Sequence, residues 1–182
     1  MAEIVAIGAS TGAACDVGGI AYAYATEISN VTGVTVGSDR EVTNFTMSST
    51  GLWAKLTPDD GDNVAFYNEV SALVGRRVEV TGSATLAFDG LSIAKIKSAN
   101  LAMACCGVAV IWVFNSGVRR IQGIEVDNAG AWKATSLDRC KITADANSGT
   151  GADKSTLVYN FTSRGRFLSP VCTLTDTAIE AL

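Results

Sequence analysis

The amino-acid sequence predicts a mainly β protein, a β-sandwich or barrel-like fold with one flanking α-helix. Short segments in which apolar and polar residues alternate recur along the chain, separated by turns rich in glycine, asparagine and aspartate. One stretch, about Ile93–Cys106, has the capping residue and the periodicity of a helix. Directly after it, Val108–Phe114 is apolar on both faces, as a strand covered on two sides would be.

Composition predicts a single domain over residues 1–182, with an N-terminal arm at 1–17 and a C-terminal tail at 170–182. The 48% hydrophobic content is enough to fill a core, and the 18% of charged residues is low for a monomer of this size. This low charge favours a chain that buries part of its surface in an assembly. The start of the chain carries Glu3 where a signal peptide would carry lysine or arginine, so we expect no secretory signal. We also expect no membrane binding, because no apolar run is long enough to span a bilayer.

The sequence contains no histidine, the commonest general base and metal ligand. Ile4–Ala14 contains the letters GASTG, which resemble the serine-bearing turn of bacterial chemotaxis methylesterases, and Ser10 would be the nucleophile. Without a histidine that reaction lacks its base. Carboxylates such as Asp59 and Asp62 have no supporting residues, and a solvated hairpin tip explains them better than a calcium loop. We therefore predict no enzyme and no catalytic, cofactor-binding or metal-binding residues.

Five cysteines, two of them adjacent, form neither a CxxC motif nor an even disulfide set, which favours buried reduced thiols. The net charge of −4 argues against a surface that binds nucleic acid tightly. Arg119 and Arg120 form a basic pair near a predicted turn. We expect them on an exposed hairpin or in a subunit salt bridge, and a phosphate contact is the less favoured alternative.

The first half of the chain predicts a series of short strands. Gly18–Ile28 alternates so that Ile20, Tyr22 and Tyr24 would share one face. Ser29–Ser38 is turn-rich with a short valine strand. In Glu41–Met47 the alternation predicts Val42 and Asn44 on one face and Phe45 and Met47 on the other. Leu52–Leu56 predicts another strand. Val64–Val74 fits either a strand or a helix by its spacing.

The middle of the chain predicts a strand at Arg77–Phe88, a turn, and then the helix, with Ser92 as its N-cap. Gly107 is placed as the residue that ends the helix, because glycine tolerates a positive φ. One helix side is expected to face the core, formed by five residues: Ile93, Ile96, Ala99, Met103 and Cys106.

The apolar strand Val108–Phe114 must be covered twice, by the helix on one side and by a sheet or a neighbouring subunit on the other. The residues that we assign to this core or assembly strand are Val108, Val110, Ile111, Trp112 and Phe114. The chain then returns through a hairpin as Val118–Val126.

The last third predicts one or two strands in Trp132–Ala144, broken near Leu137, and a long polar loop at Asp145–Lys154. Thr156–Ser163 alternates most clearly, with Leu157, Tyr159 and Phe161 directed to the core. A final strand around Val171–Leu174 and a loose tail complete the expected order.

This order of strands, helix and hairpin resembles the tail tube fold of bacteriophages and related injection machines. Specific segments are similar to virion proteins of phages that infect Bacteroidetes. They are VAFYNEV at Val64–Val70, TLAFDGLS at Thr85–Ser92, ACCGVAVIWVFNSGVRRIQGIEV at Ala104–Val126 and SGTGADKSTLVYNFTSR at Ser148–Arg164. The resemblance covers roughly residues 40 to 170 and implies that Val64–Val70 is a strand.

The resemblance implies a structural virion protein of the phage tail, assembled in the host bacterial cytoplasm. It implies homo-oligomeric rings, hexameric in such tubes, that stack and contact other tail proteins, with DNA only as a non-specific passing cargo. An acidic chain suits a channel through which DNA slides without sticking. Other virion roles, a head–tail completion or capsid decoration protein, stay open, as does a β-sandwich binding module.

Overall fold

The structure, a computed structural model, describes residues 19–48, 53–58, 66–148 and 155–182. Within these residues it confirms a mainly β fold with a flanking helix. The strands of the first half are β1 (Ile20–Glu27), β2 (Val31–Val36), β3 (Val42–Met47), β4 (Ala54–Leu56), β5 (Phe66–Val74) and β6 (Arg77–Asp89). After the helix α1 (Ile93–Ala104) come β7 (Val108–Phe114), β8 (Arg119–Gln122), β9 (Ile124–Val126), β10 (Trp132–Ala134), β11 (Asp138–Asn147), β12 (Thr156–Gly165) and the short helix α2 (Asp176–Glu180).

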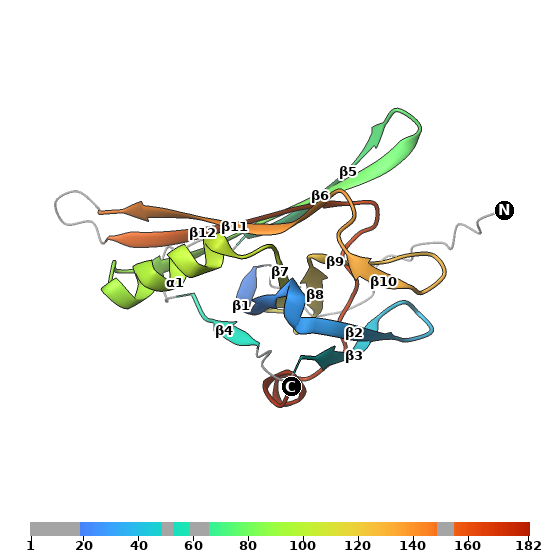
Figure 1. The fold of residues 1–182 in the computed structure, drawn as a ribbon, viewed down its shortest axis with the longest axis horizontal. Coiled ribbons are helices and arrows are strands. Elements are labelled where there is room, and N and C mark those ends of the chain that lie inside the picture. The colour runs from blue at the N-terminus through green and yellow to red at the C-terminus, as the bar shows by residue number, and fades with distance from the viewer. Residues whose placement is uncertain (1–18, 49–52, 59–65, 149–154) are drawn as a thin grey trace.

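Two antiparallel sheets of four strands each form the body (Figure 1). We call β4-β1-β7-β8 the central sheet and β11-β12-β6-β5 the outer sheet. One face of the central sheet packs against the outer sheet and α1, and its other face is covered by β2, β3, β9 and α2. The strands β2 and β3 pair with each other, as do β9 and β10. The architecture is therefore a sandwich with a third, irregular layer.

The inner core lies between the central and outer sheets. Trp112 of β7 is fully buried there and meets the ring of Phe161 edge-on at 5.0 Å between centroids. Its indole nitrogen donates a hydrogen bond to Gln122 Oε1 at 3.0 Å, and Gln122 Nε2 donates to Ser163 Oγ at 3.1 Å. This buried polar chain joins the two sheets with its partners satisfied, which fixes how they sit on each other.

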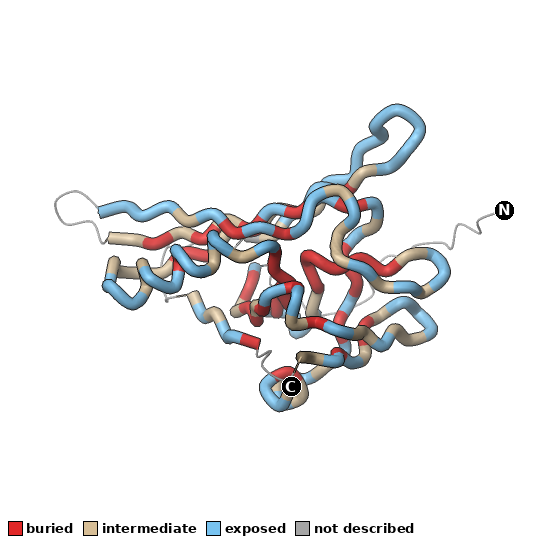
Figure 2. Tube along the Cα trace, viewed as in Figure 1, coloured by how far each residue is buried: buried red, intermediate tan, exposed pale blue. Residues whose placement is uncertain are grey.

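The two-sided strand β7 is covered on both faces by its own chain. Val108, Val110 and Trp112 face the inner core, whereas Ile111 and Val113 face the second core behind the central sheet. Figure 2 shows this strand buried along nearly its whole length. No neighbouring subunit is needed to cover it, so these positions are core residues of a single copy, and only Phe114 is half-buried.

The helix forms where the sequence predicts it, but its buried side differs. The Ser92 hydroxyl accepts a hydrogen bond from the backbone nitrogen of Lys95 at 3.2 Å, as an N-cap does. Ala99 is buried, whereas Ile93 is 91% exposed and Met103 is 42% exposed. The predicted stripe was therefore wrong at both ends, and Cys106, exposed and beyond the helix end, also lies off the core. Periodicity identified the helix, but the sheet above it selects the side that carries small residues.

Two bulges explain why the expected alternation fails in β1 and β3. The register between β1 and β7 shifts between Ile20 and Tyr22, so Ile20 joins the inner core and Tyr24 joins the second core. A shift in the β2–β3 pair lets Val42 and Phe45 both face the second core, although the sequence put them on opposite faces. An extra residue in one strand reverses the side to which later residues point.

The predicted returning strand Val118–Val126 is divided at Gly123. This glycine has φ of +92°, and a Cβ built there would lie 2.2 Å from the carbonyl oxygen of Val108. β8 before it pairs with β7, whereas β9 after it pairs with β10. The bend therefore carries the chain from the central sheet into the third layer.

The C-terminal residues are not a loose tail, as the sequence suggested. Val171 and Cys172 make bridges to β8 and β3, and α2 follows with Ile179 only 1% exposed. Burial of apolar residues holds this segment against the second core. The expected N-terminal arm at 1–17, Ser10, and the carboxylates Asp59 and Asp62 lie outside the described residues.

Candidate assembly surface

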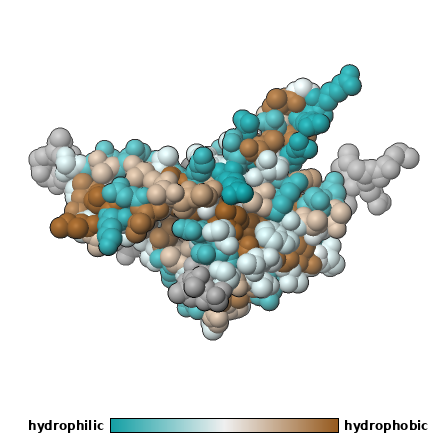
Figure 3. Space-filling model, in the orientation of Figure 1, coloured by the Kyte–Doolittle hydropathy of each residue, from teal (hydrophilic) through white to brown (hydrophobic). Residues whose placement is uncertain are grey.

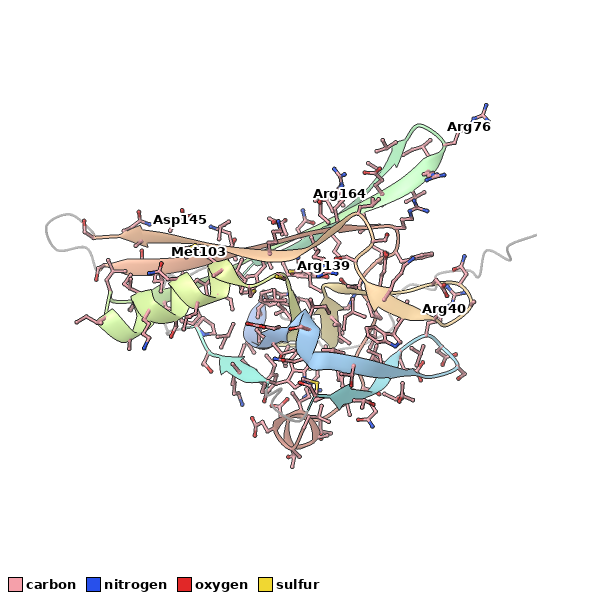
Figure 4. All side chains as sticks on the ribbon, viewed as in Figure 1. Arg40, Arg76, Met103, Arg139, Asp145 and Arg164 are labelled. Atoms are coloured by element: carbon pink, nitrogen blue, oxygen red, sulfur yellow. The ribbon has the colours of Figure 1, made fainter. Side chains whose placement is uncertain are left out.

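One face of the outer sheet is polar and is not covered by any other described part of the chain. Hydroxyl and amide side chains alternate there with the core-facing residues of β6, β11 and β12. Those on this face include Thr81, Ser83, Thr85, Thr143, Asn160 and Thr162. Asp145 and Arg164 point away from the body on the same side (Figure 4). A sheet with one apolar and one polar face presents the polar one to water.

Side chains on this face are joined across three strands. Thr85 Oγ1 on β6 donates to Asn160 Oδ1 on β12 at 3.1 Å, and Asn160 Nδ2 donates to Asp145 Oδ2 on β11 at 2.8 Å. Arg164 lies 3.4 Å from Asp138 and 3.7 Å from Glu79. The face therefore carries charges of both signs, and these exposed pairs add little stability.

Both edges of the outer sheet are long and unpaired within the described residues. β5 has nine residues and β11 has ten, and each pairs with a strand on one side only. An edge strand presents unpaired backbone N–H and C=O groups that can pair with another chain. The two edges lie at opposite sides of one sheet, so a copy can offer either edge to a neighbour.

The hairpin of β5 and β6 extends beyond the body as an arm, which we define as residues 70–79 (Figure 1). Its side chains include apolar residues that are exposed: Val70 at 54%, Leu73 at 73%, Val74 at 53% and Val78 at 50%. Arg76 stands at its tip (Figure 4). A two-stranded hairpin is marginally stable alone, and apolar side chains on both its faces favour a cover from another molecule.

The base of the arm is anchored firmly to the body. The Tyr67 ring meets the rings of Trp112 and Phe114 at 6.0 and 5.6 Å between centroids. Glu69 Oε2 accepts a hydrogen bond from Arg120 Nη2 at 2.9 Å, and Glu69 Oε1 accepts one from the backbone nitrogen of Ser169 at 2.9 Å. The arm therefore leaves the body in a defined direction.

A groove of about 450 Å³ lies between the arm and the C-terminal residues. Its lining includes Val78 from the arm and Leu168 and Val171, the last two 56% and 43% exposed. Hydrophobic residues of the arm lie beside hydrophilic ones in the space-filling view (Figure 3). The groove extends the apolar surface of the arm toward the body.

The arginine pair is used within the chain. Arg119 Nη2 lies 2.8 Å from Asp176 Oδ1, and Arg120 pairs with Glu69. Neither arginine stands on an exposed hairpin, because both side chains are partly buried. The sequence showed the charges but not their partners, which come from β5 and α2.

A second polar cluster holds α2. Tyr22 donates a hydrogen bond to Asp176, and the Tyr24 hydroxyl donates to Glu180 Oε1 at 2.7 Å. Lys55 Nζ lies 3.1 Å from the same Glu180 oxygen. Burial and the hydrogen bond to Glu180 raise the pKa of Tyr24 to about 12. The bond from Tyr24, together with Lys55, lowers the pKa of Glu180.

The described cysteines, Cys105, Cys106, Cys140 and Cys172, are free thiols. In the described part of the chain, no group of three or more cysteine, aspartate or glutamate side chains is arranged to hold a metal ion. Across the same residues, no helix is long and apolar enough to cross a membrane.

Comparison with protein family models, with curated proteins and with solved structures found no match to this chain. The features of this chain that bear on function are therefore the outer sheet, its two edges and the arm. Alternation predicted strands at β6, β11 and β12, whereas the spacing left the β5 segment open between a strand and a helix. The sequence did not reveal which of them are edges, because edges are defined by the strand order in space.

Proposed function

We propose that this chain is a structural virion subunit that assembles into rings, stacked to form a phage tail tube through which DNA passes. The observation that carries the proposal is the outer sheet, which among residues 19–48, 53–58, 66–148 and 155–182 has two long unpaired edges and an uncovered polar face. Pairing β5 of one copy with β11 of the next would extend the sheet from subunit to subunit. Such a head-to-tail contact yields a ring when the rotation closes.

The dimensions of such a ring suit a DNA channel. With four strands from each of six copies, a barrel would contain 24 strands. At about 4.8 Å between strands and a tilt of roughly 40°, the backbone ring would be roughly 50 Å across. Side chains that point inward would narrow this opening and still leave room for a duplex.

The polar face of the outer sheet would line the channel. Threonine, serine and asparagine dominate it, and Lys141 and Arg164 are offset by Asp145 and Glu79. A near-neutral hydroxyl surface offers no cluster of cations to hold phosphates, so DNA would slide over it. The sequence suggested that net acidity would keep DNA from sticking to the channel. On this face, balanced charges and hydroxyl groups would give the weak contact instead.

The arm would contact a neighbouring copy. If a partner covered its four exposed apolar side chains completely, their burial would contribute about 3–7 kcal/mol of favourable free energy to the contact. The low fraction of charged residues agrees with burial of surface in an assembly. The strand β7 no longer supports assembly, because its own chain covers it.

Electron microscopy of the purified protein, with light scattering on a sizing column, tests the proposal. We expect rings or hollow tubes with a central channel at high protein concentration. A uniform monomer at every concentration would refute self-assembly and shift the weight to a decoration protein or a binding module.

An edge variant makes the test specific. Val70→Lys places a charge on the edge strand β5, and Val118→Lys is the matched control, with 47% exposure in the turn after β7 against 54% for Val70. We expect Val70→Lys to remain monomeric under conditions in which the control forms rings. Equal assembly of both variants would exclude this edge as the contact.

A further inference from the structure

The C-terminal segment, residues 166–182, is inserted between two strands of the body. It closes the gap between β8 of the central sheet and β3 of the third layer. Four backbone hydrogen bonds hold it: Ile121 N to Pro170 O, Cys172 N to Arg119 O, Val42 N to Val171 O and Thr173 N to Val42 O, at 2.8 to 3.0 Å. Residues 170–173 thus have backbone partners on both sides, through two isolated bridges at Val171 and Cys172.

Beyond these bridges, α2 is held by the buried side chain of Ile179 and by polar contacts of its two carboxylates. The two carboxylates of α2 meet Tyr22, Tyr24, Lys55 and Arg119. The side chains of Lys55 and Glu180 are 42% and 52% exposed, so their ion pair is weak and open to water. Ile179 is the main apolar anchor. A segment fixed in this way can open locally while the sandwich stays folded.

The same segment reaches the edge strand β5 through one side chain. Glu69 on β5 is 9% exposed, and one of its oxygens accepts the backbone N–H of Ser169 while the other meets Arg120. Loss of a hydrogen-bond partner costs more free energy at a buried carboxylate than at an exposed one. Release of the segment would therefore loosen Glu69 and, with it, the base of the arm.

We propose that the C-terminal segment is a latch that controls the assembly edge: docked, it holds β5 in position for pairing with a neighbour, and released, it leaves that edge mobile. This inference rests on the proposed function. The latch itself is a property of one copy. It can be measured before any assembly takes place.

The test uses Asp176→Asn with Glu180→Gln, which removes both carboxylate charges of α2. Hydrogen exchange followed by mass spectrometry reports on residues 166–182 and on β5 in dilute protein. We expect exchange about 2- to 10-fold faster in both regions, and unchanged exchange in β7 and β12. Glu27→Gln is the control, because Glu27 is an exposed carboxylate at the end of β1 that accepts a hydrogen bond from the Ser29 hydroxyl.

A second variant, Glu69→Gln, distinguishes opening of the C-terminal segment from its effect on the edge strand β5. We expect faster exchange in β5 and slower assembly, with smaller changes in α2. If the double variant leaves exchange in 166–182 unchanged, the latch is refuted. If that region opens while β5 and the assembly rate are unaffected, the coupling is refuted. If the native protein never assembles, the tube proposal fails, and the exchange of β5 still decides the coupling.

Discussion

Replacing Ile111 by alanine tests whether β7 is a core strand of one copy or an assembly contact. Ile111 is fully buried in the second core, between Tyr24 of β1 and Ile121 of β8 in the strand register. Removing a buried isoleucine side chain to alanine costs about 2–5 kcal/mol. A domain of this kind has a free energy of unfolding of about 5–15 kcal/mol, so the loss is a large share of the total.

Urea unfolding followed by tryptophan fluorescence measures this loss. With a slope of about 2 kcal/mol per molar urea, we expect the midpoint to fall by about 1–2.5 M. The fall should be the same in dilute and concentrated protein, because the contacts lie within one chain. Val118→Ala, at a position 47% exposed, should change the free energy by about 0.5 kcal/mol or less.

Two outcomes would contradict the reasoning. An unchanged midpoint for Ile111→Ala would mean that the second core is not packed as described. A loss that grows on dilution would mean that β7 is covered by another subunit. A charge at Ile111 or at Trp112 should prevent folding altogether, since an unpaired buried charge costs several kcal/mol.

Three further predictions follow from single side chains. Glu125→Ala removes a fully buried carboxylate that accepts hydrogen bonds from the backbone N–H groups of Ser136 and Arg166, and we expect a loss of about 2–6 kcal/mol in urea unfolding. Gly123→Ala should prevent soluble expression or lower the melting temperature sharply, because its φ is positive and its Cβ would overlap the Val108 carbonyl; equal melting would show that the bend can relax. Because the pKa of Tyr24 is raised to about 12, its contribution to the free energy of unfolding is complete below pH 10 and is lost as the pH rises through about 12. Because the pKa of Glu180 is lowered, its contribution is present above the unfolded-state pKa and is lost as the pH falls through the lowered folded-state pKa. Stability measured between pH 8 and 12 should therefore decline less in Tyr24→Phe than in the native protein.

The sequence alone was sufficient for the local structure of most elements. Alternation identified β12, with Leu157, Tyr159 and Phe161 buried as predicted. The hydroxyl of Ser92 located the start of α1, and the two-sided apolar pattern identified β7 as an interior strand. These features depend on residues close together in the chain, so a single sequence contains the information.

The tertiary structure decided what depends on distant residues. The bulge after Ile20, the bend at Gly123 and the buried side of α1 follow from what packs above each element, and local periodicity does not contain that information. The docking of the C-terminal segment depends on partners more than a hundred residues away, such as Tyr24 for Glu180.

The candidate assembly surface shows the same division. The sequence predicted strand in Trp132–Ala144, where most of β11 lies, whereas the spacing of Val64–Val74 fitted a strand or a helix and only the family resemblance implied the strand that became β5. Only the order β11-β12-β6-β5 makes these two strands the edges of one sheet, and only the length of the β5–β6 hairpin beyond the body exposes Leu73. A strand is an edge strand when no other strand pairs with one of its sides, and this depends on the spatial order of all the strands.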